Sequence, residues 1–108
     1  MSKISTISDI YGGDVEIYAE YPGWRFNPDS KLRNIYKEIF EKELNKKLEI
    51  KVSPAGLEAG YLINKKPSLD IISVGPDHTG LHSPSESANI SSVINFYEAF
   101  KVFLKEID

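Results

Sequence analysis

The sequence 69-LDIISVGPDHTGLHSPSE-86 joins an apolar segment to a polar loop. Residues 69–75 are rich in β-branched side chains and interrupted only by Asp70 and Ser73, which is typical of an interior strand buried on both faces. Residues 75–86 hold both histidines of the chain, with two prolines and two glycines. Ligands of open α/β sheets bind outside the carboxyl ends of the strands, so the loop lies where a site is expected.

Strand patterns and helix patterns alternate on either side of this stretch. Residues 14–21 and 48–53 alternate apolar and polar side chains, as half-buried strands do. Residues 30–45 and 91–107 carry apolar side chains at helical spacing, and residues 55–64 form a turn and a short helix that two glycines weaken. Strands separated by helices usually lie parallel, so we predict an α/β fold with at least two mainly parallel strands flanked by helices.

Polar residues mark where the two long helices begin. Either Asp29 or Ser30 precedes the first, and either Asn89 or Ser91 precedes the second. These residue types accept hydrogen bonds from the free N–H groups of a first helical turn.

Residues 21–30, YPGWRFNPDS, connect the first predicted strand to the first long helix. Pro22 and Pro28 forbid a regular element here, so the segment is predicted to be a crossover or hinge. Its aromatic residues, which include the single tryptophan Trp24, have two interpretations. They either pack the crossover onto the helix after Ser30 or form an interaction surface.

Composition narrows the class of protein. A chain of 108 residues has room for one domain, and 41% hydrophobic with 27% charged residues is ordinary for a folded protein. The net charge of −3, spread along the chain, gives no basic face for nucleic acid. The absence of cysteine excludes disulfides and thiolate nucleophiles. The first twenty residues are not a signal peptide and no apolar run approaches membrane-spanning length, so we expect a cytoplasmic protein without a membrane partner.

His82 is the best candidate metal ligand in the loop. It stands between Gly80 and Pro84, and Ser83 and Glu86 are close enough in sequence to hydrogen-bond the unligated ring nitrogen. A solvated histidine in a turn is the alternative interpretation.

Two further side chains in the sequence, His78 and Glu58, are of types that bind metals or substrates. His78 lies four residues before His82, but the i,i+4 pairing applies on a helix and Gly80 argues against one, so His78 is not expected to bind metal. Glu58 either binds a substrate amine or complements the dipole at a helix start. A catalytic zinc needs about three protein ligands and a two-metal site needs more, so the chain, with one convincing ligand, is not expected to hold a two-metal site alone.

Four stretches together resemble the carboxyl-terminal part of the aminoacyl-histidine dipeptidases, the carnosinase-like two-zinc exopeptidases: YPGWRFNPDS, AGLEAG, LDIISVGPDHTGLHSPSE and NISSVINFYEAFKVFL. Their order and spacing agree from about Val15 to the end of the chain. The resemblance implies part of the three-layer α/β sheet of a zinc exopeptidase catalytic domain. It places the end of a lid domain or an extra strand at 1–20, a crossover hinge at 21–28 and the carboxyl-terminal part of the catalytic domain at 29–108.

The same resemblance implies roles for three residues. The histidine of the HSP turn, His82, would bind one of two zinc ions, the backbone of Gly56 would line the substrate pocket, and Glu58 lies beside it. The other ligands and the general base are expected outside these 108 residues, so no catalytic residue is assigned here. The chain departs from the family pattern HAGLECG, with Pro54 in place of histidine and Ala59 in place of cysteine.

Two functions follow as hypotheses. In the first, the chain is a fragment of a zinc-dependent dipeptidase that hydrolyses Xaa-His dipeptides with metal-activated water, and it is inactive when isolated. In the second, it is a stand-alone, non-catalytic α/β module for binding or assembly, because fold alone does not determine function. Under both, uncovered apolar surface predicts a homo-oligomer.

Overall fold

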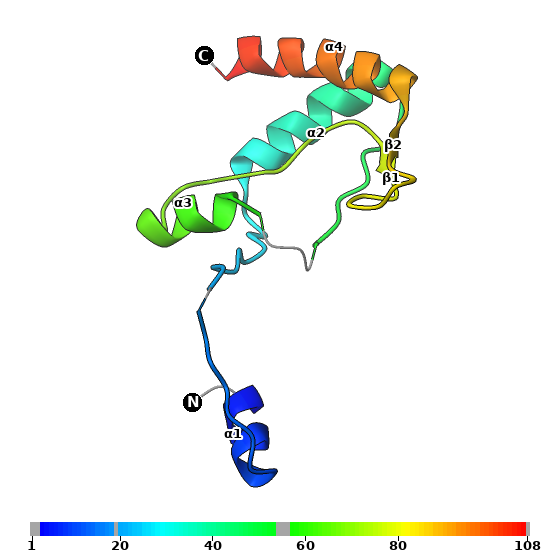
Figure 1. The fold of residues 1–108 in the computed structure, drawn as a ribbon. Helices are drawn as coiled ribbons and strands as arrows, with labels where there is room; N and C mark the ends of the chain where they lie inside the picture. The colour runs from blue at the N-terminus through cyan, green and yellow to red at the C-terminus, as the bar shows by residue number, and fades with distance from the viewer. Residues whose placement is uncertain (1–2, 19, 54–56, 108) are drawn as a thin grey trace.

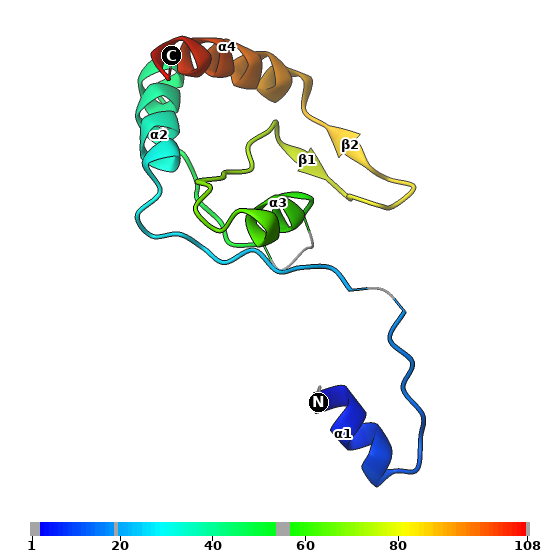
Figure 2. The same cartoon turned by 90° about the vertical axis from the view of Figure 1, so that its left-hand side faces the viewer.

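The computed structural model describes residues 3–18, 20–53 and 57–107. Its elements, in chain order, are α1 (Lys3–Ile10), α2 (Lys31–Leu44), α3 (Ala59–Lys65), β1 (His78–Thr79), β2 (Ser87–Ala88) and α4 (Ile90–Glu106). Helices α2 and α4 lie together at one end of the molecule, and α1 lies far from them at the other end (Figures 1 and 2).

The chain is much more open than a self-contained domain of its size. Its radius of gyration is 18.6 Å, whereas a compact domain of this length has about 13 Å. Its accessible surface is 9260 Å², against roughly 6,100 Å² for a compact protein of this mass. The elements therefore leave much apolar surface uncovered.

The core lies between α2 and α4, the two long helices that the sequence predicts. Tyr36, Ala99 and Phe103 are its buried apolar residues. The rings of Tyr36 and Phe103 meet edge to face, with centroids 5.3 Å apart. The ring centroid of Phe100 lies 6.1 Å from that of Phe103. This geometry is favourable for aromatic pairs beyond the area that they bury.

The structure selects one N-cap for each long helix. Ser30 Oγ accepts a hydrogen bond from the Arg33 N–H at 3.0 Å, and Asn89 Oδ1 accepts one from the Ser92 N–H at 3.1 Å. Ser30 rather than Asp29, and Asn89 rather than Ser91, therefore begin α2 and α4.

Asp70 connects the segment after α3 to the N-terminus of α2. Its Oδ2 accepts a hydrogen bond from the Leu32 N–H at 2.9 Å, while Oδ1 is buried and has no well-aligned partner among the described residues. The hydroxyl of Ser30, and then the Leu32 N–H, hold the pKa of Asp70 below its usual value. A charged residue interrupts the apolar stretch because it caps a helix that lies far away in the sequence.

The predicted parallel sheet is not found among the described residues. Residues 14–18, 48–53 and 69–75 run without a strand partner, and the one described sheet pairs β1 with β2 antiparallel. His78 lies opposite Ala88 and Thr79 opposite Ser87 in this hairpin. A strand needs a neighbouring strand to accept its hydrogen bonds, and no described segment pairs with these three in a ladder. A mixture of helices and strands remains, without the parallel pairing.

Helix α1 was missed in the segment predicted as the end of a lid or an extra strand. Ile4, Ile7 and Tyr11 are three and four residues apart, a helical spacing that could have revealed it. All three side chains are exposed. The predicted short helix is present as α3, with its start at Ala59 inside the predicted range and Pro54 outside the described residues.

The last residues of the crossover pack against the first turn of α2. The Arg33 guanidinium lies over the Phe26 ring, 4.8 Å from its centroid, and donates to the carbonyl oxygens of Asn27 and Pro28. Trp24 is half-buried. These contacts agree with the interpretation in which the aromatic residues pack the crossover onto the helix.

Truncation of Phe103 should separate the two long helices. Phe103→Ala removes a ring that is only 4% exposed, so we expect the free energy of unfolding to fall by about 3 kcal/mol or more. Urea unfolding followed by circular dichroism measures this loss. The control is Ile94→Ala, because Ile94 lies in α4 and is 59% exposed. An equal fall in the free energy of unfolding for this variant would contradict the proposed core.

The cap from Asp70 predicts a loss of stability in acid. A carboxyl whose folded pKa is lowered stabilises the fold above its unfolded pKa of about 3.8, and this contribution disappears as pH falls through the folded pKa. Asp70→Asn should flatten this part of the profile of urea midpoint against pH. Asp29→Asn, at an exposed carboxyl beside the same helix, should leave the acid loss as in the parent chain.

Candidate functional site

The loop between β1 and β2 is built around Gly80 and Ser83. Gly80 has φ +65°, and a Cβ there would lie only 3.0 Å from the carbonyl oxygen of Ser85. The N–H and hydroxyl of Ser83 both donate to the Gly80 carbonyl, at 3.1 and 2.6 Å. The Glu86 N–H donates in turn to the Ser83 carbonyl at 3.1 Å. The loop is therefore a pair of hydrogen-bonded turns that requires glycine at position 80.

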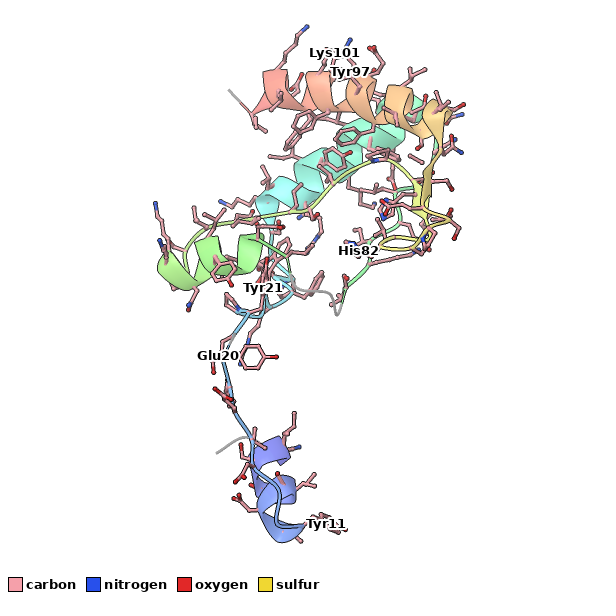
Figure 3. The ribbon with its side chains drawn as sticks, in the orientation of Figure 1. Tyr11, Glu20, Tyr21, His82, Tyr97 and Lys101 are labelled. Atoms are coloured by element: carbon pink, nitrogen blue, oxygen red, sulfur yellow. The ribbon has the colours of Figure 1, made fainter. Side chains whose placement is uncertain are left out.

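His82 lies within these turns in a left-handed backbone conformation, with φ 60° (Figure 3). For a residue with a Cβ this conformation costs roughly 1–2 kcal/mol. The carboxylate of Glu86 stabilises it, because Oε2 accepts a hydrogen bond from the His82 N–H at 3.0 Å. The hydrogen bond from the His82 N–H to the Glu86 carboxylate therefore stabilises this costly backbone conformation.

The contacts of the His82 ring differ from those predicted. Ser83 and Glu86 were expected to hydrogen-bond a ring nitrogen, but their side chains bind backbone groups of the loop instead. The ring is exposed and makes no hydrogen bond with another described residue. Both nitrogens are open to a ligand from outside this part of the chain.

His78 lies in β1, at the base of the hairpin. Its Nδ1 is 3.2 Å from the Pro76 carbonyl oxygen, a distance at which the protonated nitrogen donates. The His78 ring thus contacts the segment just before its own strand. That His78 binds no metal stays a prediction.

The structure describes only part of the predicted substrate region. Gly56 lies outside the described residues. Glu58 is the N-cap residue of α3 and its side chain makes no capping hydrogen bond, while its carbonyl accepts the Tyr61 N–H at 3.0 Å. Ala59 is the first residue of the helix. Glu58 therefore stands at a helix start, where both of its interpretations remain open.

A metal site needs several ligand side chains close together. Among residues 3–18, 20–53 and 57–107, no three His, Asp or Glu side chains gather closely enough to bind a metal ion. The exposed His82 imidazole fits the role of one ligand, but about three are needed for a catalytic zinc. The described residues do not complete a metal site, so we assign no reaction step to a metal in this chain.

Comparison with known proteins identifies the class. Residues 9–106 match the family described as Peptidase family M20/M25/M40, and the chain belongs to this family. The structure resembles the crystal structure of the aminoacylhistidine dipeptidase from Vibrio alginolyticus, with a TM-score of 0.72 and 32% identity over 96% of this chain and 21% of that one. The resemblance to aminoacyl-histidine dipeptidases is confirmed.

A second relative also shows how much of a whole dipeptidase this chain covers. The cytosol non-specific dipeptidase of Escherichia coli (strain K12) is 33% identical over 107 residues, which are 99% of this chain and 22% of that protein. The chain thus spans about a fifth of the length of the relatives it matches. In the described part of the chain no helix is long and apolar enough to cross a membrane.

Substitution of Gly80 should disrupt the loop that carries His82. Gly80→Ala forces a Cβ into a left-handed position only 3.0 Å from a carbonyl oxygen, so we expect a loss of roughly 1 kcal/mol or more in hairpin stability. Amide hydrogen exchange at residues 78–88 measures it. Gly75→Ala is the matched control, because nothing lies within 4 Å of its added Cβ; equal effects of the two substitutions would contradict this account of the loop.

Proposed function

We propose that the chain is one segment of a zinc-dependent dipeptidase that hydrolyses Xaa-His dipeptides in the cytoplasm. In this proposal His82 is one zinc ligand, and Gly56 and Glu58 border the bound dipeptide. The remaining ligands and the general base lie outside this chain, so the chain has no peptidase activity alone. Membership of the peptidase family and the likeness to two dipeptidases support the proposal.

The observation that carries the role of His82 is its backbone conformation. Left-handed residues with a Cβ are costly and concentrate at functional sites, where the surrounding structure maintains them. Glycine would adopt φ 60° at lower cost, yet the chain has a histidine there and a carboxylate that holds its N–H. A histidine that only filled a solvated turn would need neither the strain nor the partner.

The proposed role of Glu58 follows from its position and charge. Its carboxylate is exposed and makes no capping hydrogen bond in α3. A carboxylate in this state pairs readily with the free amine of a dipeptide. The helix-start interpretation requires only the charge, so replacement by aspartate would preserve it while shortening the reach to substrate.

A stand-alone module for binding or assembly is the second candidate. The uncovered surface favours it, since Ile7, Tyr18 and Ile90 are between 57% and 89% exposed, and the proposed homo-oligomer would cover such surface. The intact mass of the native polypeptide separates the candidates. A mass several times 12.2 kDa supports the dipeptidase, whereas 12.2 kDa supports the module.

The role of His82 can be tested in a chimera. The chain replaces the matching segment of the Escherichia coli dipeptidase, with which it shares 33% identity. The chimera should cleave dipeptides, and His82→Ala should lower kcat/KM by more than about 100-fold, since even partners that only orient a ligand account for about 10–100-fold.

His78→Ala is the matched control for this experiment. It removes the other histidine of the same hairpin and should change kcat/KM by less than about threefold, because that exposed ring bonds the carbonyl of Pro76, two residues away. The content of bound zinc is measured in each variant. Full activity and zinc content in His82→Ala would refute the proposed ligand.

A further inference from the structure

Residues 20–22 pack against α3, although about forty residues separate them in the sequence. The rings of Tyr21 and Tyr61 meet edge to face with centroids 4.7 Å apart. The Tyr61 hydroxyl donates to the Glu20 carbonyl at 3.3 Å. Figure 2 shows the crossing segment passing beside α3, and Figure 3 shows Tyr21 at the same place.

Only glycine fits at position 60 in this contact. A Cβ on Gly60 would lie 2.3 Å from the carbonyl oxygen and 3.3 Å from the carbonyl carbon of Pro22. Ordinary contact begins at 3.4 Å, so the two backbones would have to separate by the difference of 3.4 and 2.3 Å, about 1.1 Å. The obstructing atoms belong to the main chain, so no side-chain rotation relieves the overlap.

The same turn carries Glu58. The Gly60 N–H donates to the Leu57 carbonyl at 2.9 Å, and the Tyr61 N–H donates to the Glu58 carbonyl at 3.0 Å. Any displacement of Gly60 therefore displaces the backbone of Glu58. Burial against α3 first, and then the charge of Glu58, raise the pKa of Tyr21, which agrees with a carboxylate near the phenol.

The other end of the crossing is also anchored. Arg33 of α2 donates to the carbonyls of Asn27 and Pro28 and covers the Phe26 ring. Residues 20–28 thus run between two helices with contacts at each end, one set on α3 and one on α2. The segment that contacts the turn of Glu58 is therefore also attached to α2.

We infer that Gly60 is a positioning residue, and that its backbone contact with Pro22 sets the place of Glu58 at the substrate. The inference rests on the proposed function, because Glu58 matters for a dipeptide only if the chain belongs to the dipeptidase site. It extends that function by assigning substrate affinity to a glycine that is buried against Pro22. A displacement of about 1 Å at a site of this kind reduces activity by up to about 100-fold.

The contact itself is tested by NMR on the 108-residue chain. We expect a nuclear Overhauser effect between the Tyr21 and Tyr61 rings, which Gly60→Ala abolishes while shifting the Glu58 amide signal. Gly23→Ala is the control, because its Cβ meets nothing within 4 Å and its φ is not positive. A Gly60→Ala spectrum that matches the Gly23→Ala spectrum overturns the inference.

The effect on substrate is tested in the dipeptidase chimera. Gly60→Ala should raise KM by at least about 10-fold with bound zinc unchanged, whereas Gly23→Ala leaves KM as in the parent. A purely structural defect would instead lower zinc content and active fraction at constant KM, and that result overturns the inference. An inactive parent chimera counts against the proposed function, and the NMR result then decides the contact separately.

A second pair of variants covers a failure of Gly60→Ala to fold. Tyr61→Leu removes the edge contact and the hydrogen bond to Glu20 without adding a Cβ overlap, and should raise KM severalfold. Tyr18→Leu is the control on an 89% exposed ring. Equal KM values for these two variants overturn the inference.

Discussion

The contact of Tyr36 with Phe103 is the constraint on which the rest of the structure depends. It joins α2 to α4, and each helix then holds one of the connecting segments. The N-terminus of α2 binds Asp70, which places the start of residues 69–75. The N-terminus of α4 binds Asp77, whose N–H donates to Ser92 Oγ at 2.9 Å and whose carbonyl accepts the Asn89 N–H at 3.0 Å. The segment from Asp70 to Asp77, which leads to His82, is therefore attached at its two ends to two helices that this aromatic pair joins.

The helices were predictable because their determinants are local. A helix satisfies its own backbone hydrogen bonds, so apolar spacing and a capping residue were enough to predict α2 and α4 within one or two residues of their ends. The three predicted strands lacked this property. Alternation and β-branching indicate that a segment can pair, but the pairing itself needs a neighbour that the described residues do not bring alongside. Helix α1 had the required spacing, but its residues were predicted only as the end of a lid domain or an extra strand.

The loop of the candidate site was predictable, whereas its contacts were not. The glycine, histidine and proline content of residues 75–86 predicted a tight loop with one ligand-type side chain. It did not predict that Glu86 binds the N–H of His82 rather than its ring, because that choice depends on the left-handed backbone. Gly60 was interpreted only as a residue that weakens a helix. Its actual requirement comes from Pro22, and a close approach of distant segments leaves no trace in local sequence.

His82 and Glu58 thus differ in how the chain determines their positions. The position of His82 follows from hydrogen bonds within seven residues, from Gly80 to Glu86, and from the attachment of that loop to α4. The position of Glu58 follows from a contact across about forty residues, maintained by Tyr21 and Pro22 on a segment that is exposed except at Pro22 and Trp24. Local turns are insensitive to the surface that the rest of a longer protein would cover, whereas a long-range contact depends on the path of the whole crossing. In this chain the geometry of the candidate ligand is therefore self-contained, and that of the candidate substrate residue is conditional on the crossing from residue 20 to residue 28.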